Sequence, residues 1–179
     1  MLQDIKEILL SEEVISAKIK ELAERISDDY KERDLLVVGV LKGSVIFTAD
    51  LIKNIKIPCE IDFMAVSSYG NSSETSGIVR ILKDLDHEVS GKDIIIVEDI
   101  VDSGVTLNYL LNYLKSRRAN SVEIVSLLTK PSRRKVDIDC KYIGFEVPDE
   151  FLVGYGLDYA EKYRNLPFIG ILKREVYEK

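Results

Sequence analysis

Three predominantly apolar runs, of which the first is continuous, constrain the fold more than any other feature of the sequence. They are LLVVGVL at 35–41, DIIIVEDI at 93–100 and SVEIVSLLT at 121–129. A strand covered on one face alternates apolar and polar residues, whereas a continuous run indicates a strand buried on both faces. Amphipathic segments separate the runs. We therefore expect an α/β fold, with a mostly parallel, twisted sheet flanked by helices.

The remaining elements follow from spacing and turn residues. Ser11 is a candidate N-cap for a helix in which Ile15, Ile19, Leu22 and Ile26 form one apolar face. The sequence predicts helices at 11–29, 44–54 and 107–118, and further strands at 59–69 and 77–85. In the tail, short strands are expected in KYIGFEVP, FLVGYG and FIGIL. In such sheets ligands bind beyond the carboxyl ends of the strands, so the residues after each run are candidate site residues.

Length and composition bound the class of protein. The 179 residues fit one domain, 1–179. No stretch reaches the roughly 20 apolar residues that span a bilayer. The N-terminal MLQDIKEILLSEEV lacks the basic flank and apolar run of a secretory signal. These features predict a cytoplasmic protein without a membrane partner.

Several kinds of chemistry are disfavoured. Cys59 and Cys140 lack CxxC spacing or a nearby histidine, which indicates buried or spare thiols rather than a metal or redox site. His87, the one histidine, lies in a polar turn, so a Ser-His-Asp or Cys-His device is not expected. The net charge of −6 argues against nonspecific nucleic-acid binding. The chemistry should therefore rest on carboxylates, lysines and a metal.

The segment VEDIVDSGVT, 97–106, gathers polar groups where an apolar run ends. Glu98 and Asp99 close the run, Asp102 follows, and 103–106 open a helix. Amides and hydroxyls at a helix N-terminus suit a phosphate, while paired carboxylates suit ribose hydroxyls or Mg²⁺. The alternative is that Asp102 or Ser103 only caps the helix. The density of groups favours the phosphate site, and the absence of GxxxxGK[ST] excludes a P-loop.

The same segment closely resembles the phosphoribosyl pyrophosphate (PRPP) motif of type I phosphoribosyltransferases. Other segments, in matching order, resemble the hypoxanthine-guanine branch: VGVLKGS at 38–44, SSYG at 67–70, LLTKPSRR at 127–134 and GFEVPDEFLVGYGLDYAEKYRNLP at 144–167. The resemblance implies purine salvage, in which hypoxanthine or guanine reacts reversibly with PRPP to give IMP or GMP and pyrophosphate, with Mg²⁺ required. It also implies a small hood formed by terminal segments, and a homo-oligomer, dimer or tetramer.

The resemblance assigns roles within the motif. Glu98 and Asp99 match the carboxylates that bind the ribose hydroxyls and the metal, and Asp102 matches the catalytic acid or base that faces N7 of the purine. Ser103, Gly104 and Thr106, with the backbone of Val105, match the cradle of the 5′-phosphate. Many relatives carry threonine and lysine in place of Ser103 and Val105, which makes backbone donors more important here.

The pyrophosphate end is assigned in the same way. Lys42 and Gly43 would receive pyrophosphate on exposed amides, although a plain strand-to-helix turn explains the pair equally well. The Leu41–Lys42 peptide is often cis in the family. Arg164 matches a guanidinium that contacts pyrophosphate.

Residues 67–77 match a mobile lid, in which Ser68 and Tyr69 close over the pyrophosphate and keep water from the sugar. The alternative is a disordered hairpin tip.

The purine end is assigned to four residues. Lys130 would donate to the exocyclic O6, Phe151 would stack on the base, and Leu152 would offer backbone contacts to its edge. Asp158 is assigned beside the base as a second metal carboxylate. Without the resemblance, Lys130 reads as a solvated lysine, Phe151 as core, and Asp158 and Arg164 as surface charges.

Two other functions stay open. A xanthine-preferring phosphoribosyltransferase differs only in a few contacts to the base edge. An RNA-binding regulator on the same fold would need a basic face, for which KPSRRK at 130–135 is the single candidate cluster.

Overall fold

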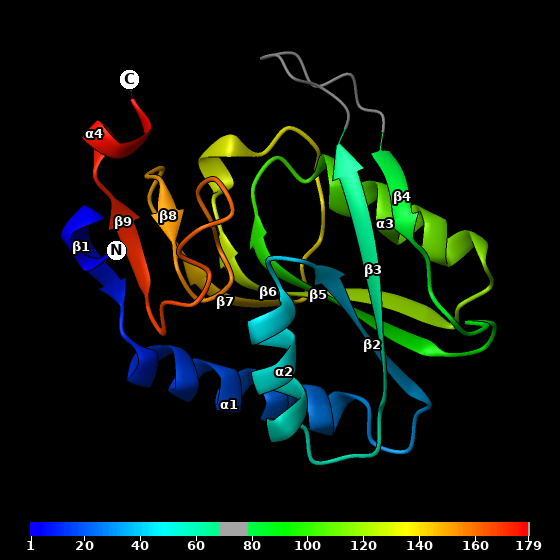
Figure 1. The fold of residues 1–179 in the computed structure, drawn as a ribbon. Coiled ribbons are helices and arrows are strands. Elements are labelled where there is room, and N and C mark those ends of the chain that lie inside the picture. Colours follow the sequence, from blue (N-terminus) through cyan, green and yellow to red (C-terminus); the bar gives the residue numbers. More distant parts are fainter. Residues whose placement is uncertain (69–78, 179) are drawn as a thin grey trace.

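A six-stranded sheet forms the centre of the computed structural model, which describes residues 1–68 and 79–178 (Figure 1). Its strand order is β4-β3-β2-β5-β6-β7, and every neighbouring pair is parallel except β3 and β4. The strands are β2 (Leu35–Leu41), β3 (Glu60–Ser68), β4 (Val79–Lys83), β5 (Asp93–Val101), β6 (Ser121–Thr129) and β7 (Tyr142–Glu146). The predicted mostly parallel sheet is confirmed.

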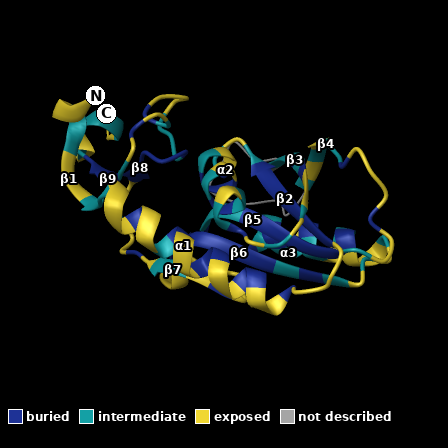
Figure 2. Cartoon of the chain, turned by 90° about the horizontal axis from the view of Figure 1, so that it is seen from below, coloured by how far each residue is buried: buried dark blue, intermediate teal, exposed yellow. Residues whose placement is uncertain are grey.

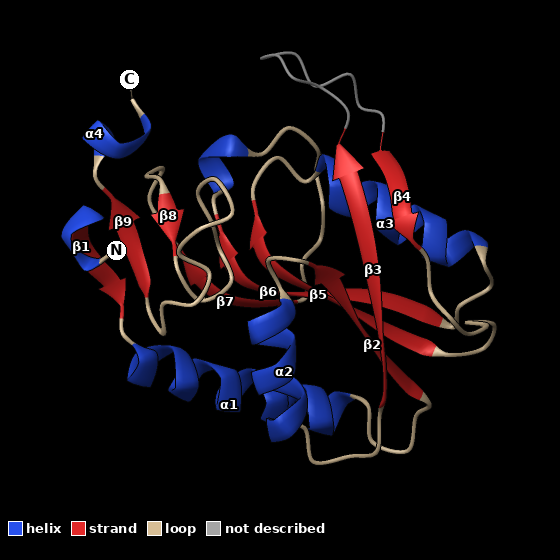
Figure 3. Ribbon diagram, in the orientation of Figure 1, coloured by secondary structure: helices blue, strands red, loops and turns tan. Residues whose placement is uncertain are grey.

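Helices cover both faces of this sheet (Figure 3). Helices α1 (Glu12–Asp29) and α2 (Val45–Asn54) pack on one face, and α3 (Val105–Ser116) packs on the other. Ser11 caps α1 as predicted, since its Oγ accepts a hydrogen bond from the Val14 amide at 3.4 Å. The central strands β2 and β5 are buried on both faces over most of their length, which explains the apolar sequences of β2 and of 94–97 in β5 (Figure 2).

A smaller sheet forms the hood from terminal segments, as the resemblance implied. Its antiparallel order is β1-β9-β8, from β1 (Ile5–Leu10), β9 (Ile169–Leu172) and β8 (Leu152–Val153). The short helix α4 (Arg174–Tyr177) follows β9, and it lies with β1 at the hood end of the molecule (Figure 1). One-turn 3₁₀ helices occupy Leu2–Asp4 and Pro131–Arg133.

The sequence analysis missed β1 and α4, and it placed some boundaries wrongly. β1 lacks strict alternation and depends on pairing with β9, 160 residues away in sequence, so no local signal marks it. The helix predicted to reach Arg118 ends at Ser116, because Arg118 adopts φ 63°. Tyr69 and the rest of the predicted lid beyond Ser68 lie outside the described residues. No described helix is long and apolar enough to span a bilayer.

Asp62 on β3 gives the fold a measurable dependence on pH. Its carboxylate accepts hydrogen bonds from the amides of Asp86 and Phe63, at 2.8 and 2.7 Å, and from Lys83 Nζ at 3.3 Å. Burial raises the pKa of Asp62, but these bonds outweigh burial, so its pKa lies below the usual value. The stabilising contribution of such a group is present above the unfolded-state pKa and disappears as the pH falls through the folded-state pKa.

We therefore expect Asp62→Asn to lower the free energy of unfolding by about 1–3 kcal/mol at pH 7. The difference from the wild type should shrink below roughly pH 4, near the unfolded-state pKa of an aspartate. Urea unfolding at pH 7 and at pH 3.5 measures both quantities. A difference that stays constant between the two pH values contradicts this account.

Candidate active site

The predicted site residues follow three neighbouring parallel strands. Lys42 and Gly43 follow β2, the 98–106 segment closes β5 and opens α3, and Lys130 follows β6. Carboxyl ends of parallel strands meet at one edge of a sheet, so these segments are brought together. The Lys130 amide donates to the Val101 carbonyl at 2.9 Å, which fixes the end of β6 to the end of β5.

The turn after β2 packs directly against the Asp99 carboxylate. A Cβ on Gly43 would lie 1.8 Å from Asp99 Oδ2, and a Cβ on Gly156 would lie 2.0 Å from the Gly43 carbonyl oxygen. At Gly156 the clash is with backbone, so a side chain there has no room, whereas at Gly43 a side chain would force the Asp99 carboxylate to move. Three segments distant in sequence therefore meet around Asp99. The Leu41–Lys42 peptide beside this contact is cis, as in the resembling family.

Glu98 and Asp99 are held in surroundings that disfavour their charged forms. Burial raises the pKa of Glu98 well above its usual value, and the adjacent Asp99 raises it further. Burial also raises the pKa of Asp99 to about 6, against the opposing effect of the Ile100 amide and of Arg164. Glu98 Oε2 is buried without a hydrogen-bond partner among the described residues. A hydroxyl donor or a cation from a ligand would satisfy these oxygens.

The predicted phosphate cradle surrounds a small cavity at the start of α3. The cavity has a volume of about 100 Å³, and Glu98, Asp102, Ser103, Gly104 and Thr106 are among the residues that line it. The first amide of α3 bonded within the helix is that of Asn108, which donates to the Gly104 carbonyl at 2.9 Å, so the preceding amides are available to an anion. The Val105 amide is the exception, because it donates to Ser103 Oγ at 3.3 Å.

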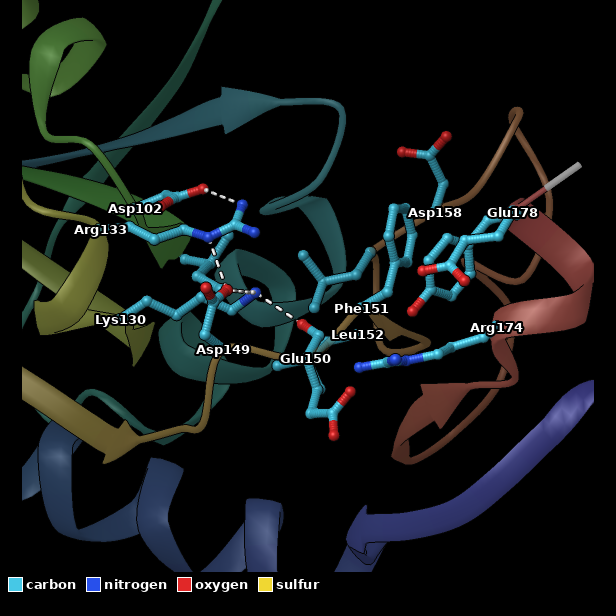
Figure 4. A pocket seen from close by; sticks show the side chains of 13 residues that line it. Asp102, Lys130, Arg133, Asp149, Glu150, Phe151, Leu152, Asp158, Arg174 and Glu178 are labelled. Carbon is cyan, nitrogen blue, oxygen red and sulfur yellow. Dashed lines mark hydrogen bonds and ion pairs between the residues drawn. The ribbon is translucent and has the colours of Figure 1, made fainter.

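A larger cavity of about 390 Å³ adjoins the cradle and shares Asp102 with it (Figure 4). The residues predicted to meet the purine all line it, together with Asp102: Lys130, Phe151, Leu152 and Asp158. The structure therefore brings the predicted phosphate end and the predicted base end of the site side by side. Ser68 is the last residue of β3, and Tyr69 lies outside the described residues.

Lys130 is a buried amine at this cavity rather than a solvated surface lysine. The residue is 6% exposed, its Nζ donates to the Glu150 carbonyl at 2.7 Å, and it lies 3.8 Å from the Asp149 carboxylate (Figure 4). Burial lowers the pKa of Lys130, and Arg133 lowers it further. Arg133 forms ion pairs with Asp102 at 3.4 Å and with Asp149 at 2.5 Å. Asp102 Oδ1 is buried without a partner among the described residues.

The hood closes the other side of the cavity with aromatic rings. Phe151 stacks on Tyr177 with a centroid distance of 4.8 Å and an interplanar angle of 28°. Tyr159 meets the Phe151 ring edge-on at 5.5 Å. Phe151 is 37% exposed, so it is not a core residue and retains free surface.

Arg164 and Asp158 are paired next to the Gly43–Gly156 contact. Arg164 Nη2 lies 2.8 Å from Asp158 Oδ1, and its Nη1 donates to the Gly156 carbonyl at 2.7 Å. Arg164 Nε is buried without a partner in the part of the chain that the structure describes. Lys42 Nζ bonds to Glu161 at 2.8 Å. The predicted pyrophosphate residues Lys42, Gly43 and Arg164 therefore lie in one cluster.

Known proteins match almost the whole chain. The family model described as "Phosphoribosyl transferase domain" matches residues 6–160. The chain is 57% identical over 178 residues to the "Hypoxanthine-guanine phosphoribosyltransferase" of Bacillus subtilis (strain 168), with 99% of each chain covered. The chain belongs to the phosphoribosyltransferase family.

Structural comparison agrees with this assignment. The crystal structure of a hypoxanthine phosphoribosyltransferase from Staphylococcus aureus superposes with a TM-score of 0.98 at 53% identity, covering 100% of this chain and 97% of the other. The chain is also 53% identical to the "Bifunctional protein TilS/HprT" of Listeria monocytogenes serotype 4b (strain F2365), of which it spans 28%. The predicted type I phosphoribosyltransferase fold is confirmed.

Sequence reasoning missed several groups that this phosphoribosyltransferase places in its site. Arg174, Tyr177 and Glu178 line the larger cavity, but they lie in and after a one-turn helix without a sequence signal. Arg133 was considered only as part of a basic cluster, although its position three residues after Lys130 marks it as a neighbour of the same strand end.

The two thiols and the histidine line neither of the two cavities described above. Cys59 and Cys140 are free and partly buried, and His87 is exposed.

The predicted metal carboxylates Glu98, Asp99 and Asp158 do not form a cage. Among residues 1–68 and 79–178, no three His, Cys, Asp or Glu side chains gather so as to hold a metal ion. Mg²⁺ in phosphate chemistry is commonly bound by one or two carboxylates with the remaining positions taken by substrate phosphates and water. Asp99 and Asp158 are close enough for the charge of Asp158 to raise the pKa of Asp99, and this pair fits that mode.

Gly104 offers a test of the cradle with a matched control. Gly104 has φ 81° and a Cβ there would lie 3.2 Å from the Val136 carbonyl, whereas Gly91 has φ 79° and open space around it. We expect both alanine variants to lose about 1–2 kcal/mol of stability from the left-handed backbone. Gly104→Ala alone should also raise the KM for PRPP. An unchanged KM for PRPP in Gly104→Ala argues against the assigned cradle.

Proposed function

We propose that this phosphoribosyltransferase acts in purine salvage, transferring the 5-phosphoribosyl group of PRPP to hypoxanthine or guanine with release of pyrophosphate. The observation that carries the proposal is the buried Lys130 amine at a cavity that shares Asp102 with the proposed phosphate cradle. The name of the Bacillus subtilis relative supports both bases, and that of the Staphylococcus aureus structure supports hypoxanthine.

The base is read by a hydrogen-bond donor. The Lys130 ammonium donates a hydrogen bond to the O6 oxygen of hypoxanthine or guanine. Adenine carries an amino group at this position, which is itself a donor and cannot accept that bond. Breaking the Lys130 contact with the Glu150 carbonyl frees one proton of the ammonium for this role. The exposed surface of Phe151 provides an apolar platform for the purine ring.

The sugar and its phosphate are held at the adjoining cradle. Amides at the start of α3 and the hydroxyls of Ser103 and Thr106 bind the 5′-phosphate, and Glu98 and Asp99 accept hydrogen bonds from the ribose hydroxyls. Asp102 lines both cavities, so it stands between phosphate and base. Its unpartnered Oδ1 accepts the proton from N7 of the base as C1′ is transferred.

The pyrophosphate end comprises Lys42, Gly43 and Arg164. The Arg164 guanidinium offers its unpartnered Nε, and the turn at Gly43 offers backbone amides. Mg²⁺ would be held by Asp99 and Asp158 together with substrate oxygens, and when bound it neutralises charge on the pyrophosphate. We propose Mg²⁺ as the cofactor on the chemistry of this donor set and on the family membership.

The competing functions have less support. Lys130 is buried and Arg133 is paired with Asp102 and Asp149, so the cluster at 130–135 does not form the basic face that an RNA-binding regulator needs. Hypoxanthine, guanine and xanthine all carry O6, so Lys130 does not distinguish xanthine from the other two. A preference for xanthine depends on contacts at the 2-position of the base. A cytoplasmic location and a dimer or tetramer stay predictions from the sequence and the family.

Initial rates with PRPP, Mg²⁺ and each of hypoxanthine, guanine, xanthine and adenine test the proposal. We expect transfer to hypoxanthine and guanine, with one pyrophosphate released per nucleotide formed, and no measurable transfer to adenine. Efficient transfer to xanthine, with poor use of hypoxanthine and guanine, would replace the proposal with the xanthine alternative. Equal use of adenine would exclude Lys130 as the group that selects the base.

Lys130→Met removes the proposed donor to O6 of the base and keeps an apolar side chain of similar length. Loss of a charged donor to O6 costs about 1.5–3 kcal/mol, so kcat/KM for hypoxanthine and guanine should fall by roughly 10-fold or more. Adenine should gain relative to them, and the KM for PRPP should stay within about twofold. Calorimetry with PRPP on the same variant separates the two effects. A collapse of PRPP binding at unchanged base efficiency would be evidence against the assignment.

A further inference from the structure

A buried tyrosine joins the two segments that form the proposed pyrophosphate end. The Tyr155 hydroxyl donates a hydrogen bond to Asp50 Oδ2 at 2.5 Å. Tyr155 lies in the loop that leads to Asp158 and Arg164, and Asp50 lies on α2. The two residues are 105 positions apart in sequence, so this bond is a long-range constraint.

On the loop side, Tyr155 is fixed in a strained conformation between two glycines. Its φ is 51°, which an L-residue adopts only when its surroundings hold it there. Its amide donates to the Leu166 carbonyl at 2.8 Å, and the residue is 6% exposed. The next residue, Gly156, accepts the Arg164 hydrogen bond and packs on the Gly43 carbonyl. A shift of Tyr155 therefore moves the peptide that orients Arg164.

On the helix side, Asp50 is connected to the turn after β2. Helix α2 begins at Val45, directly after Lys42, Gly43 and Ser44, and it is a rigid element only ten residues long. Asp50 also forms an ion pair with Lys53 at 2.6 Å, one turn along the helix. The position of α2 sets where the Lys42–Gly43 turn lies, so the Tyr155–Asp50 bond restrains both halves of the pyrophosphate end relative to each other.

We propose that Tyr155 is a positioning residue for the pyrophosphate group, acting through its hydrogen bond to Asp50. The proposal rests on the proposed function, because it takes Lys42, Gly43 and Arg164 as the pyrophosphate contacts. Tyr155 itself does not line the cavity next to Asp158 that is proposed to hold the base. Its role is to keep the Gly43 amide and the Arg164 guanidinium at a fixed separation before substrate binds, which lowers the ordering cost of binding.

The protonation states suit a permanent bond. Burial raises the pKa of Tyr155, and the Asp50 carboxylate raises it further, so the hydroxyl remains a donor throughout the working pH range. Burial raises the pKa of Asp50, but the bonds from Lys53 and Tyr155 outweigh it, so Asp50 remains a charged acceptor. A hydrogen bond to a charged acceptor is stronger than one between neutral groups.

Tyr155→Phe removes the hydroxyl and keeps the ring in the core. We expect the KM for PRPP in the forward reaction and the KM for pyrophosphate in the reverse reaction to rise by about 10-fold, the usual size of one lost charge-assisted bond. The KM for guanine and for GMP should stay within about twofold, because the base pocket and the phosphate cradle are untouched. A loss of folding alone does not produce this split between substrates.

Tyr142→Phe is the matched control. Tyr142 is fully buried, and its hydroxyl donates to Asp29 Oδ2 at 2.5 Å, which joins β7 to the end of α1 away from both cavities. We expect the two variants to lose melting temperature by similar amounts, while the KM for pyrophosphate changes only in Tyr155→Phe. Asp50→Asn keeps an oxygen acceptor but loses its charge, so its KM for pyrophosphate should fall between those of the wild type and Asp50→Ala, whereas Asp50→Ala should reproduce Tyr155→Phe.

The proposal is overturned if Tyr155→Phe raises the KM of every substrate alike, or if its kinetics match those of Tyr142→Phe. It is also overturned if the effects of Asp50→Ala and Tyr155→Phe on the KM for pyrophosphate add fully in the double variant. Two substitutions that remove the same hydrogen bond should not have additive effects. Failure of the proposed function gives a different result, in which the wild type itself transfers no phosphoribosyl group to a 6-oxopurine. Calorimetry of the variants with magnesium pyrophosphate then still measures the positioning effect directly.

Discussion

The close approach of the backbone at Gly43 to the Asp99 carboxylate is the constraint on which the rest of the site depends. A Cβ on Gly43 would lie 1.8 Å from Asp99 Oδ2 and would displace that carboxylate, and the Gly156 loop packs on the backbone of the same turn. The ends of β2 and β5 and the loop that carries Arg164 are thereby fixed around one carboxylate. Positioning within tenths of an ångström is what catalysis by orientation requires of a protein scaffold.

This packing also determines the electrostatics. Glu98 and Asp99, near the end of β5, carry raised pKa values. The free protein therefore holds their charged forms at a cost in stability. Ribose hydroxyls and a cation would relieve that cost, so part of the binding energy of the substrate comes from groups that folding leaves unsatisfied. The order β2-β5-β6 then sets Lys130 beside the cradle, and the hood supplies the aromatic wall on the other side.

The sequence predicted the elements that their own residue pattern marks, and missed those that depend on a distant partner. The runs at 35–41, 93–100 and 121–129 correspond to β2, β5 and β6, because a strand buried on both faces is apolar over most of its length. β1 could not be predicted, because its partner β9 lies at the other end of the chain. Likewise, the motif at 97–106 predicted residues that line one small cavity, whereas the Tyr177 ring on Phe151 depends on how the hood folds back.

A crystal structure of this phosphoribosyltransferase with bound GMP tests the central claim most directly. The account predicts the 5′-phosphate within hydrogen-bond distance of the amides at the start of α3, and the guanine O6 within hydrogen-bond distance of Lys130 Nζ. It also predicts that the Gly43–Asp99 contact is unchanged from the free protein. A phosphate bound elsewhere, or a base that lies away from Lys130, would contradict the account.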